Sequence, residues 1–159
     1  MVREERVGDM GKQGIRVLLV DDHNTVRTSL HRMLEHTGDI EVVGEGINGL
    51  DALKMVENLN PDVLILDVEM PEMDGIEVTH ILNKMNSPVK ILILSAYDDE
   101  GYIKNVLEQG AVGYLIKDEP PANIIEAVRL AVRGKKAEKS ESYNQDYRLN
   151  FHRASGHLG

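Results

Sequence analysis

Five polar side chains of this 159-residue sequence have the chemistry of a site that binds a cation and an anion together. They are Asp21, Asp22, Asp67, Ser95 and Lys117. Three clustered carboxylates repel one another unless a cation lies among them, and their oxygens suit a hard divalent ion such as Mg2+. An ammonium and a hydroxyl beside such an ion could bind and neutralise the oxygens of a phosphoryl group.

The elements that must position these side chains are short apolar segments, each followed by one of them or by a turn. The segments are residues 15–20, 40–43, 63–66, 89–94 and 112–116. Val, Ile and Leu occupy both faces of each segment, which is typical of buried parallel strands. Stretches with apolar residues at helical spacing alternate with them, as at Val26, Leu30 and Leu34. This alternation predicts an α/β fold with a doubly wound parallel sheet, in which ligands bind at the carboxyl ends of the strands.

The chain divides into one predicted domain with a polar segment at each end. We expect a loose segment over residues 1–14, the α/β domain over residues 15–134, and a linker-like or disordered tail over residues 135–159. Three glycines follow predicted helices at positions where helices commonly stop: Gly38, Gly110 and Gly134.

The composition argues against several classes of protein. A formal net charge of −9 disfavours a free-standing nucleic-acid binder. No apolar stretch approaches the roughly 20 residues of a membrane span and no signal-peptide pattern is present, so we expect a cytoplasmic protein with no membrane partner. The absence of cysteine excludes disulfides and thiolate metal sites.

The order of the polar residues resembles the receiver domain of two-component response regulators. The residues that carry the resemblance are Asp21-Asp22, Asp67, Met70-Pro71, Asp74-Gly75, Ser95-Ala96, Tyr114 and Lys117. The resemblance covers about residues 15–133, and it implies a CheY-like, flavodoxin-like (βα)5 three-layer sandwich with a five-stranded parallel sheet in the order 2-1-3-4-5. The Asp21-Asp22-His23 sequence and the Lys117-Asp118 pair are both similar to the class of receivers attached to LuxR-type helix-turn-helix output domains.

The resemblance also implies a phosphoacceptor and a metal site. Asp67 would accept the phosphoryl group in a reaction that requires Mg2+. Asp22 and Asp67 would bind Mg2+ directly, together with the backbone carbonyl of Glu69, and Asp21 would act through a bound water.

Other residues are implied to bind the phosphoryl group or to respond to it. Lys117 and Ser95 would contact the phosphoryl oxygens, and Tyr114 would turn inward when Ser95 moves towards them. Three residues that border the site would tune donor access and the lifetime of the acyl phosphate: Glu69, Ala96 and Tyr97. In many receivers a proline with a cis peptide bond follows the lysine, whereas Asp118 follows it here, so the geometry of the Lys117–Asp118 bond stays open.

The implied function is a phosphorylation switch rather than a turnover enzyme. A sensor histidine kinase would phosphorylate it, the output would be transcription, and phosphorylation would promote a homodimer. No LuxR-type output domain follows within the sequence, so we expect this chain not to bind DNA by itself.

Three alternatives remain at this point. The first is a stand-alone regulator that acts by protein contact. The second is an Asp-nucleophile phosphatase, although Glu69 occupies the place of its usual second aspartate. The third is a flavin or nucleotide module, which lacks a Gly-rich loop after residues 15–20. His23 is interpreted as a turn residue, and the other histidines are interpreted as solvated surface.

Overall fold

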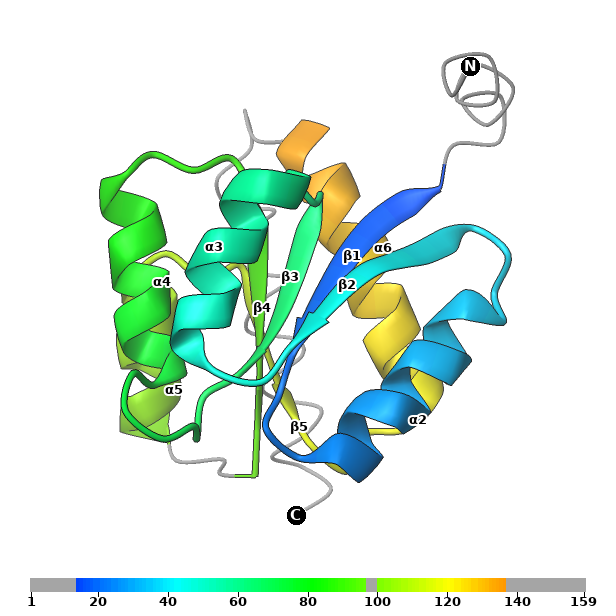
Figure 1. The fold of residues 1–159 in the computed structure, drawn as a ribbon, viewed down its shortest axis with the longest axis horizontal. Helices are drawn as coiled ribbons and strands as arrows, with labels where there is room; N and C mark the ends of the chain where they lie inside the picture. Colours follow the sequence, from blue (N-terminus) through cyan, green and yellow to red (C-terminus); the bar gives the residue numbers. More distant parts are fainter. Residues whose placement is uncertain (1–13, 97–99, 137–159) are drawn as a thin grey trace.

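The computed structural model describes residues 14–96 and 100–136, with side chains through Gly134. The strands are β1 (Ile15–Val20), β2 (Ile40–Gly46), β3 (Val63–Asp67), β4 (Lys90–Ser95) and β5 (Gly113–Ile116). The helices are α2 (Asn24–Glu35), α3 (Gly49–Leu59), α4 (Gly75–Lys84), α5 (Glu100–Glu108) and α6 (Pro121–Lys136). Strands and helices alternate along the chain, as predicted (Figure 1). Every predicted strand is present, with its ends shifted by no more than three residues.

The five strands form one parallel sheet in the order β2-β1-β3-β4-β5, which confirms the expected fold. The chain leaves β1 for β2 on one side and returns to β3 on the other, so the topological switch point lies between β1 and β3. Val20 of β1 pairs with Leu66 of β3 in register. The next residue of each strand is an aspartate, and this register therefore brings Asp21 beside Asp67.

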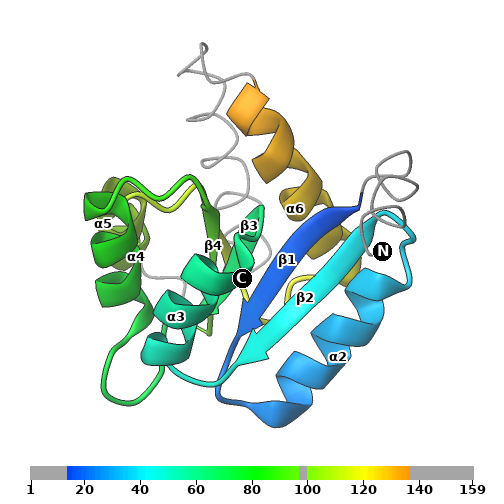
Figure 2. The same ribbon diagram turned by 45° about the horizontal axis from the view of Figure 1, so that its top comes forward.

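Both faces of the sheet are covered by helices, which makes the domain three layers deep. Figures 1 and 2 show α3, α4 and α5 on one side of the sheet and α2 and α6 on the other. Alternate residues of β1 enter the two cores: Leu18 and Val20 face the first group of helices, and Val17 and Leu19 face the second. All four are buried. Because helices shield both faces from solvent, the strands contain continuous apolar runs instead of an alternation of apolar and polar residues.

Two of the three predicted helix stops are correct. Gly38 follows α2 with φ 88° and Gly110 follows α5 with φ 122°, a conformation that favours glycine. The predicted stop at Gly134 is wrong, because α6 continues to Lys136. Ala127, Ala131 and Gly134 lie at helical spacing and are all buried, and Ala127 and Ala131 belong to the core beneath α6. None of the described helices has the length and apolarity to cross a membrane.

We predict that Gly75→Ala destabilises the domain because of crowding between α4 and β3. A Cβ atom at Gly75 would lie 2.8 Å from Val68 Cα and 2.9 Å from the carbonyl oxygen of Asp67, and neither is a flexible side chain. We expect a loss of about 1–3 kcal/mol in the free energy of unfolding by urea. Gly14→Ala is the control, since its Cβ has no neighbour nearer than 3.7 Å. Equal stabilities of the two variants would show that the backbone of β3 can yield.

Candidate functional site

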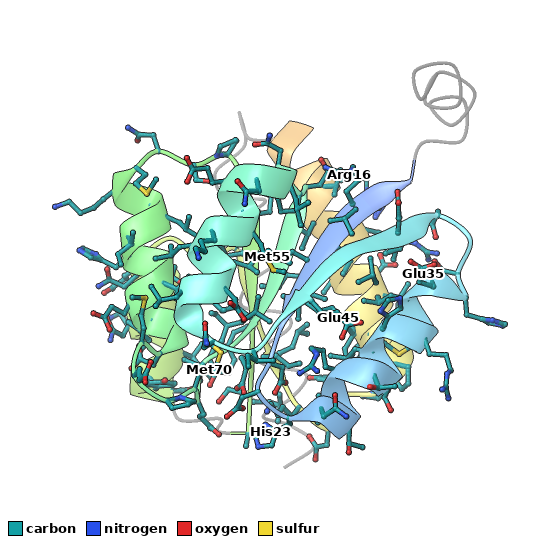
Figure 3. All side chains as sticks on the ribbon, in the orientation of Figure 1. Arg16, His23, Glu35, Glu45, Met55 and Met70 are labelled. Carbon is teal, nitrogen blue, oxygen red and sulfur yellow. The ribbon has the colours of Figure 1, made fainter. Side chains whose placement is uncertain are left out.

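The carboxyl ends of β1 and β3 hold an acidic cluster, formed by Asp21, Asp22, His23 and Asp67. One donor atom from each of these residues lies within 4.8 Å of the others. The side chains of Asp21 and Asp67 are 4% and 0% exposed, whereas that of Asp22 is 32% exposed. Figure 3 shows His23 at this end of the sheet and Arg16 at the other. The three predicted metal-binding carboxylates therefore come together, and a histidine joins them.

Asp67, the last residue of β3, is the most deeply buried of the carboxylates. Its Oδ1 accepts a hydrogen bond of 3.0 Å from the backbone N–H of Glu69, which fixes the plane of the carboxylate. Its Oδ2 is buried without a hydrogen-bond partner. Burial raises the pKa of Asp67 to about 6, and the negative charge of Asp21 contributes to the rise. The Glu69 N–H and the Lys117 ammonium oppose it only in part.

Lys117 supplies the positive charge that the cluster needs. Its Nζ atom lies 3.3 Å from Asp67 Oδ2 and 3.4 Å from Asp21 Oδ2. The backbone N–H of Lys117 donates to the carbonyl oxygen of Ser95, which continues the pairing of β4 with β5 into the loop. All described peptide bonds are trans, so the Lys117–Asp118 bond is trans as well.

The donor set fits a divalent cation. Three carboxylates and one ammonium leave a formal charge of −2 in a mostly buried volume. Among the described residues, Asp21 Oδ2 and Asp67 Oδ2 are the buried side-chain oxygens without a hydrogen-bond partner. One ammonium, that of Lys117, is shared between these two oxygens and offsets their lost solvation only in part, so a divalent cation would stabilise them further. Carboxylate oxygens are also the ligands that Mg2+ prefers.

Ser95 and Glu69 are in contact through their side chains. Ser95 ends β4 and is fully buried, and its hydroxyl donates to Glu69 Oε2 over a long 3.5 Å. Ala96, which follows, is exposed and small. Tyr97, the other predicted tuning residue, lies outside the described residues.

Tyr114 is part of the core on β5. It is 1% exposed, and its ring meets the ring of Tyr102 on α5 edge-on, with centroids 6.5 Å apart and planes at 89°. This is an inward orientation. An outward orientation of Tyr114 would break the edge-to-face contact and open space between β5 and α5.

Arg27 was not predicted from the sequence, although it binds the backbone of the acidic cluster at Asp21. Its guanidinium donates to the carbonyl oxygen of Asp21 at 2.7 Å, to Glu45 Oε1 at 2.8 Å and to Asn24 Oδ1 at 2.8 Å. Burial raises the pKa of Glu45, but hydrogen bonds from His31 and Arg27 outweigh burial and leave that pKa below its usual value. Arg27 and Glu45 are 18 residues apart, and no local pattern pairs them.

His23 does more than its predicted role in a turn. Its backbone N–H donates to Asp21 Oδ1 at 2.8 Å, which agrees with that role. Its ring, however, points into the acidic cluster, with Nδ1 3.0 Å from Asp21 Oδ1 and 3.2 Å from Asp22 Oδ1. The residue types alone suggested only a neighbour of the acidic pair, because the side-chain rotamer is not readable from sequence.

Comparison with known proteins identifies relatives of this domain. The family model for the response regulator receiver domain matches residues 17–129. The transcriptional regulatory protein DegU of Brevibacillus brevis is 40% identical over 120 residues, which are 76% of this chain and 51% of that protein. LiaR of Bacillus subtilis is 42% identical over 120 residues, 76% of this chain and 57% of that protein. The chain thus spans about half the length of these curated relatives.

A solved structure agrees with the sequence relatives. The receiver domain of the putative response regulator NarL from Mycobacterium tuberculosis superimposes with a TM-score of 0.75 at 36% identity. The match covers 77% of this chain and 98% of the solved one.

We predict that Asp67→Asn stabilises the metal-free domain at neutral pH. The pKa of about 6 in the folded chain lies above the ordinary 3.8, so folding stability falls as pH rises from about 4 to 6 and then stays low. The stability of Asp67→Asn should not fall in this way. Above pH 6 its free energy of unfolding should exceed that of the wild type by up to about 3 kcal/mol. Urea unfolding in EDTA between pH 4 and 8 measures it. An advantage that does not shrink towards pH 4 would contradict the charge argument.

We predict that Arg27→Gln weakens binding of Mg2+ to the acidic cluster about tenfold, because it frees the carbonyl of Asp21. Arg16→Gln is a matched control. Like Arg27, Arg16 donates to backbone carbonyls. Its partners are the carbonyls of Leu59 and Asn60, at the opposite end of the sheet. It should lower stability but leave Mg2+ affinity within about twofold in calorimetric titrations. The same loss of affinity in both variants would mean that Arg27 acts through general stability alone.

Proposed function

Because the chain belongs to the family of response regulator receiver domains, we propose that phosphorylation of Asp67 by a sensor histidine kinase switches it. The observation that carries this proposal is the environment of the Asp67 carboxylate. It is fully buried beside Asp21, its Oδ2 has no hydrogen-bond partner, and the ammonium of Lys117 lies 3.3 Å away. A buried carboxylate beside an ammonium supports the proposal, because phosphoryl transfer needs a positioned nucleophile and nearby positive charge.

In the proposed reaction, a carboxylate oxygen of Asp67 attacks the phosphorus of a phosphohistidine. The P–N bond breaks, the imidazole leaves with its electron pair, and an acyl phosphate forms on Asp67. The N–H of Glu69 holds the carboxylate plane during the attack, since it already binds Oδ1. Lys117 stays beside the reacting oxygen and neutralises charge on the transferred group. Small phosphodonors such as acetyl phosphate would react in the same way.

We assign the metal of this reaction as Mg2+. Asp22, Asp67 and the backbone carbonyl of Glu69 would bind it directly, and Asp21 would act through a bound water. Mg2+ supplies neutralisation of the phosphoryl oxygens when it is bound. The formal charge of −2 on the carboxylates and Lys117 matches a divalent ion, which supports this assignment.

The proposed switch begins at Ser95. Its hydroxyl, which donates weakly to Glu69, would turn to donate to a phosphoryl oxygen instead. Tyr114, which lies on β5 three residues before Lys117, would then be held in its inward orientation. The surface formed by α5, β5 and α6 would change as a result. Glu69, Ala96 and Tyr97 would tune the lifetime of the acyl phosphate.

The proposed output is transcription. Curated relatives are named as transcriptional regulatory proteins and are about twice as long as the matched region. We propose that DNA binding in this family belongs to a further domain and not to the receiver, that phosphorylation promotes a homodimer, and that the protein acts in the cytoplasm as a switch without turnover of its own.

Intact mass spectrometry after incubation with phosphoramidate and Mg2+ tests the proposal. We expect one phosphoryl group on the wild type and none on Asp67→Asn or in EDTA. Asp62→Asn is the control, because Asp62 accepts a hydrogen bond from the backbone N–H of Arg16 at the opposite, amino ends of the strands. A phosphoryl group that persists on Asp67→Asn, or none on folded wild type, would refute the assignment. Sustained release of phosphate from simple esters would favour the phosphatase alternative.

A further inference from the structure

We propose that His23 is a nitrogen ligand of the acidic cluster and that it gives the cluster affinity for Zn2+ in addition to Mg2+. The proposal rests on the cation site of the proposed function. It adds a residue and a class of ion that the proposed phosphoryl transfer does not use.

The orientation of the His23 ring is the first observation. His23 is the N-cap residue of α2, yet its side chain makes no capping hydrogen bond. The ring turns instead towards the carboxylates, with Nδ1 3.0 Å from Asp21 Oδ1, 3.2 Å from Asp22 Oδ1 and 3.7 Å from Asp67 Oδ2. The side chain is 55% exposed, so an ion can reach this nitrogen from solvent.

The second observation concerns the two buried oxygens that lie beside the Lys117 ammonium. Asp21 Oδ2 and Asp67 Oδ2 belong to side chains that are 4% and 0% exposed, and both lack a hydrogen-bond partner. The Lys117 ammonium lies 3.4 and 3.3 Å from these oxygens and 3.2 Å from His23 Nδ1. An ammonium can only donate, so two oxygens and one nitrogen already converge on a single positive centre.

The chemistry of this donor set distinguishes between cations. Mg2+ binds oxygen ligands, keeps several waters and gains little from an imidazole. Zn2+ binds imidazole nitrogen together with carboxylate oxygen, commonly with four ligands. Asp21, Asp22, His23 and Asp67 supply four such donors within 4.8 Å. The ring therefore selects for Zn2+ and hardly affects Mg2+.

A consequence for the switch follows from the number of ligands. Four protein donors complete the coordination of Zn2+ and leave no open position for a phosphoryl oxygen. Zn2+ also engages the carboxylate of Asp67. It should therefore compete with Mg2+ and slow phosphorylation, and the imidazole should be needed for that inhibition at low Zn2+ concentration.

Calorimetric titration at one fixed pH with ZnCl2 and, separately, MgCl2 tests the ligand. We expect the ratio of Zn2+ to Mg2+ affinity to fall about tenfold or more in His23→Gln. His80→Gln is the matched control: it removes an exposed imidazole on α4, where His80 contacts Gln109, and it should keep the wild-type ratio. The remaining histidines are common to His23→Gln and His80→Gln, so weak surface binding of Zn2+ cancels in the comparison.

Nuclear magnetic resonance of 15N-labelled histidine rings gives a direct second readout. The Nδ1 resonance of His23 should shift with Zn2+ and stay in place with Mg2+. An unchanged affinity ratio in His23→Gln, or an unmoved Nδ1 resonance, overturns the inference. If Mg2+ fails to bind the wild type while Zn2+ still moves this resonance, the inference stands and the Mg2+ site of the proposed function fails.

Discussion

Mutual repulsion among three carboxylates at the carboxyl ends of β1 and β3 is the constraint on which the rest of this structure depends. Asp21, Asp22 and Asp67 lie within a few ångströms of one another, and two of them are almost fully buried. Such an arrangement destabilises the folded chain, since burial and, after it, the negative charge of Asp21 raise the pKa of Asp67. It persists because other parts of the molecule hold each carboxylate in place. Lys117 lies between two of them, and Arg27 binds the carbonyl of the first.

The fold supplies the stability that offsets this repulsion. The central strands are apolar on both faces, and each face is covered by helices, so β1, β3 and β4 are almost completely buried. Burial of apolar area on this scale is the dominant favourable contribution to folding. Within this sheet, the register of β1 with β3 brings Asp21 beside Asp67. The functional edge is thus destabilised locally within a framework that is stable as a whole.

The same repulsion makes the site responsive. A cluster with excess negative charge is stabilised when a divalent ion binds, and it would then tolerate a phosphoryl group that is otherwise repelled. The residues that would sense this change lie on neighbouring strands. Ser95 on β4 and Lys117 after β5 are joined by a backbone hydrogen bond, and Tyr114 is packed in the core of β5. Under the proposed function, a change at the acidic cluster would have only these contacts to cross before it reached α5 and α6.

The sequence by itself determined the parallel α/β class, the strands to within three residues, and the acidic and cationic residues at their ends. These follow from apolar runs and from polar residues at their ends, which are local properties of the chain. The strand order came from the resemblance of the ordered motif, since periodicity alone does not order strands. Gly134 showed the limit of local reasoning, because packing of small residues carried α6 past a glycine that usually stops a helix.

Only the tertiary structure decided how the side chains around the acidic cluster meet. Arg27 and Glu45 are 18 residues apart, and Lys117 and His23 are 94 residues apart. Contacts of this kind depend on the packing of α2 and on the register of the sheet, and no spacing in the sequence encodes them. The direction of the His23 ring likewise depends on its side-chain rotamer, which the sequence does not specify. The sequence thus named most of the polar residues of the site, and the tertiary structure decided which of their atoms lie within 4.8 Å of one another.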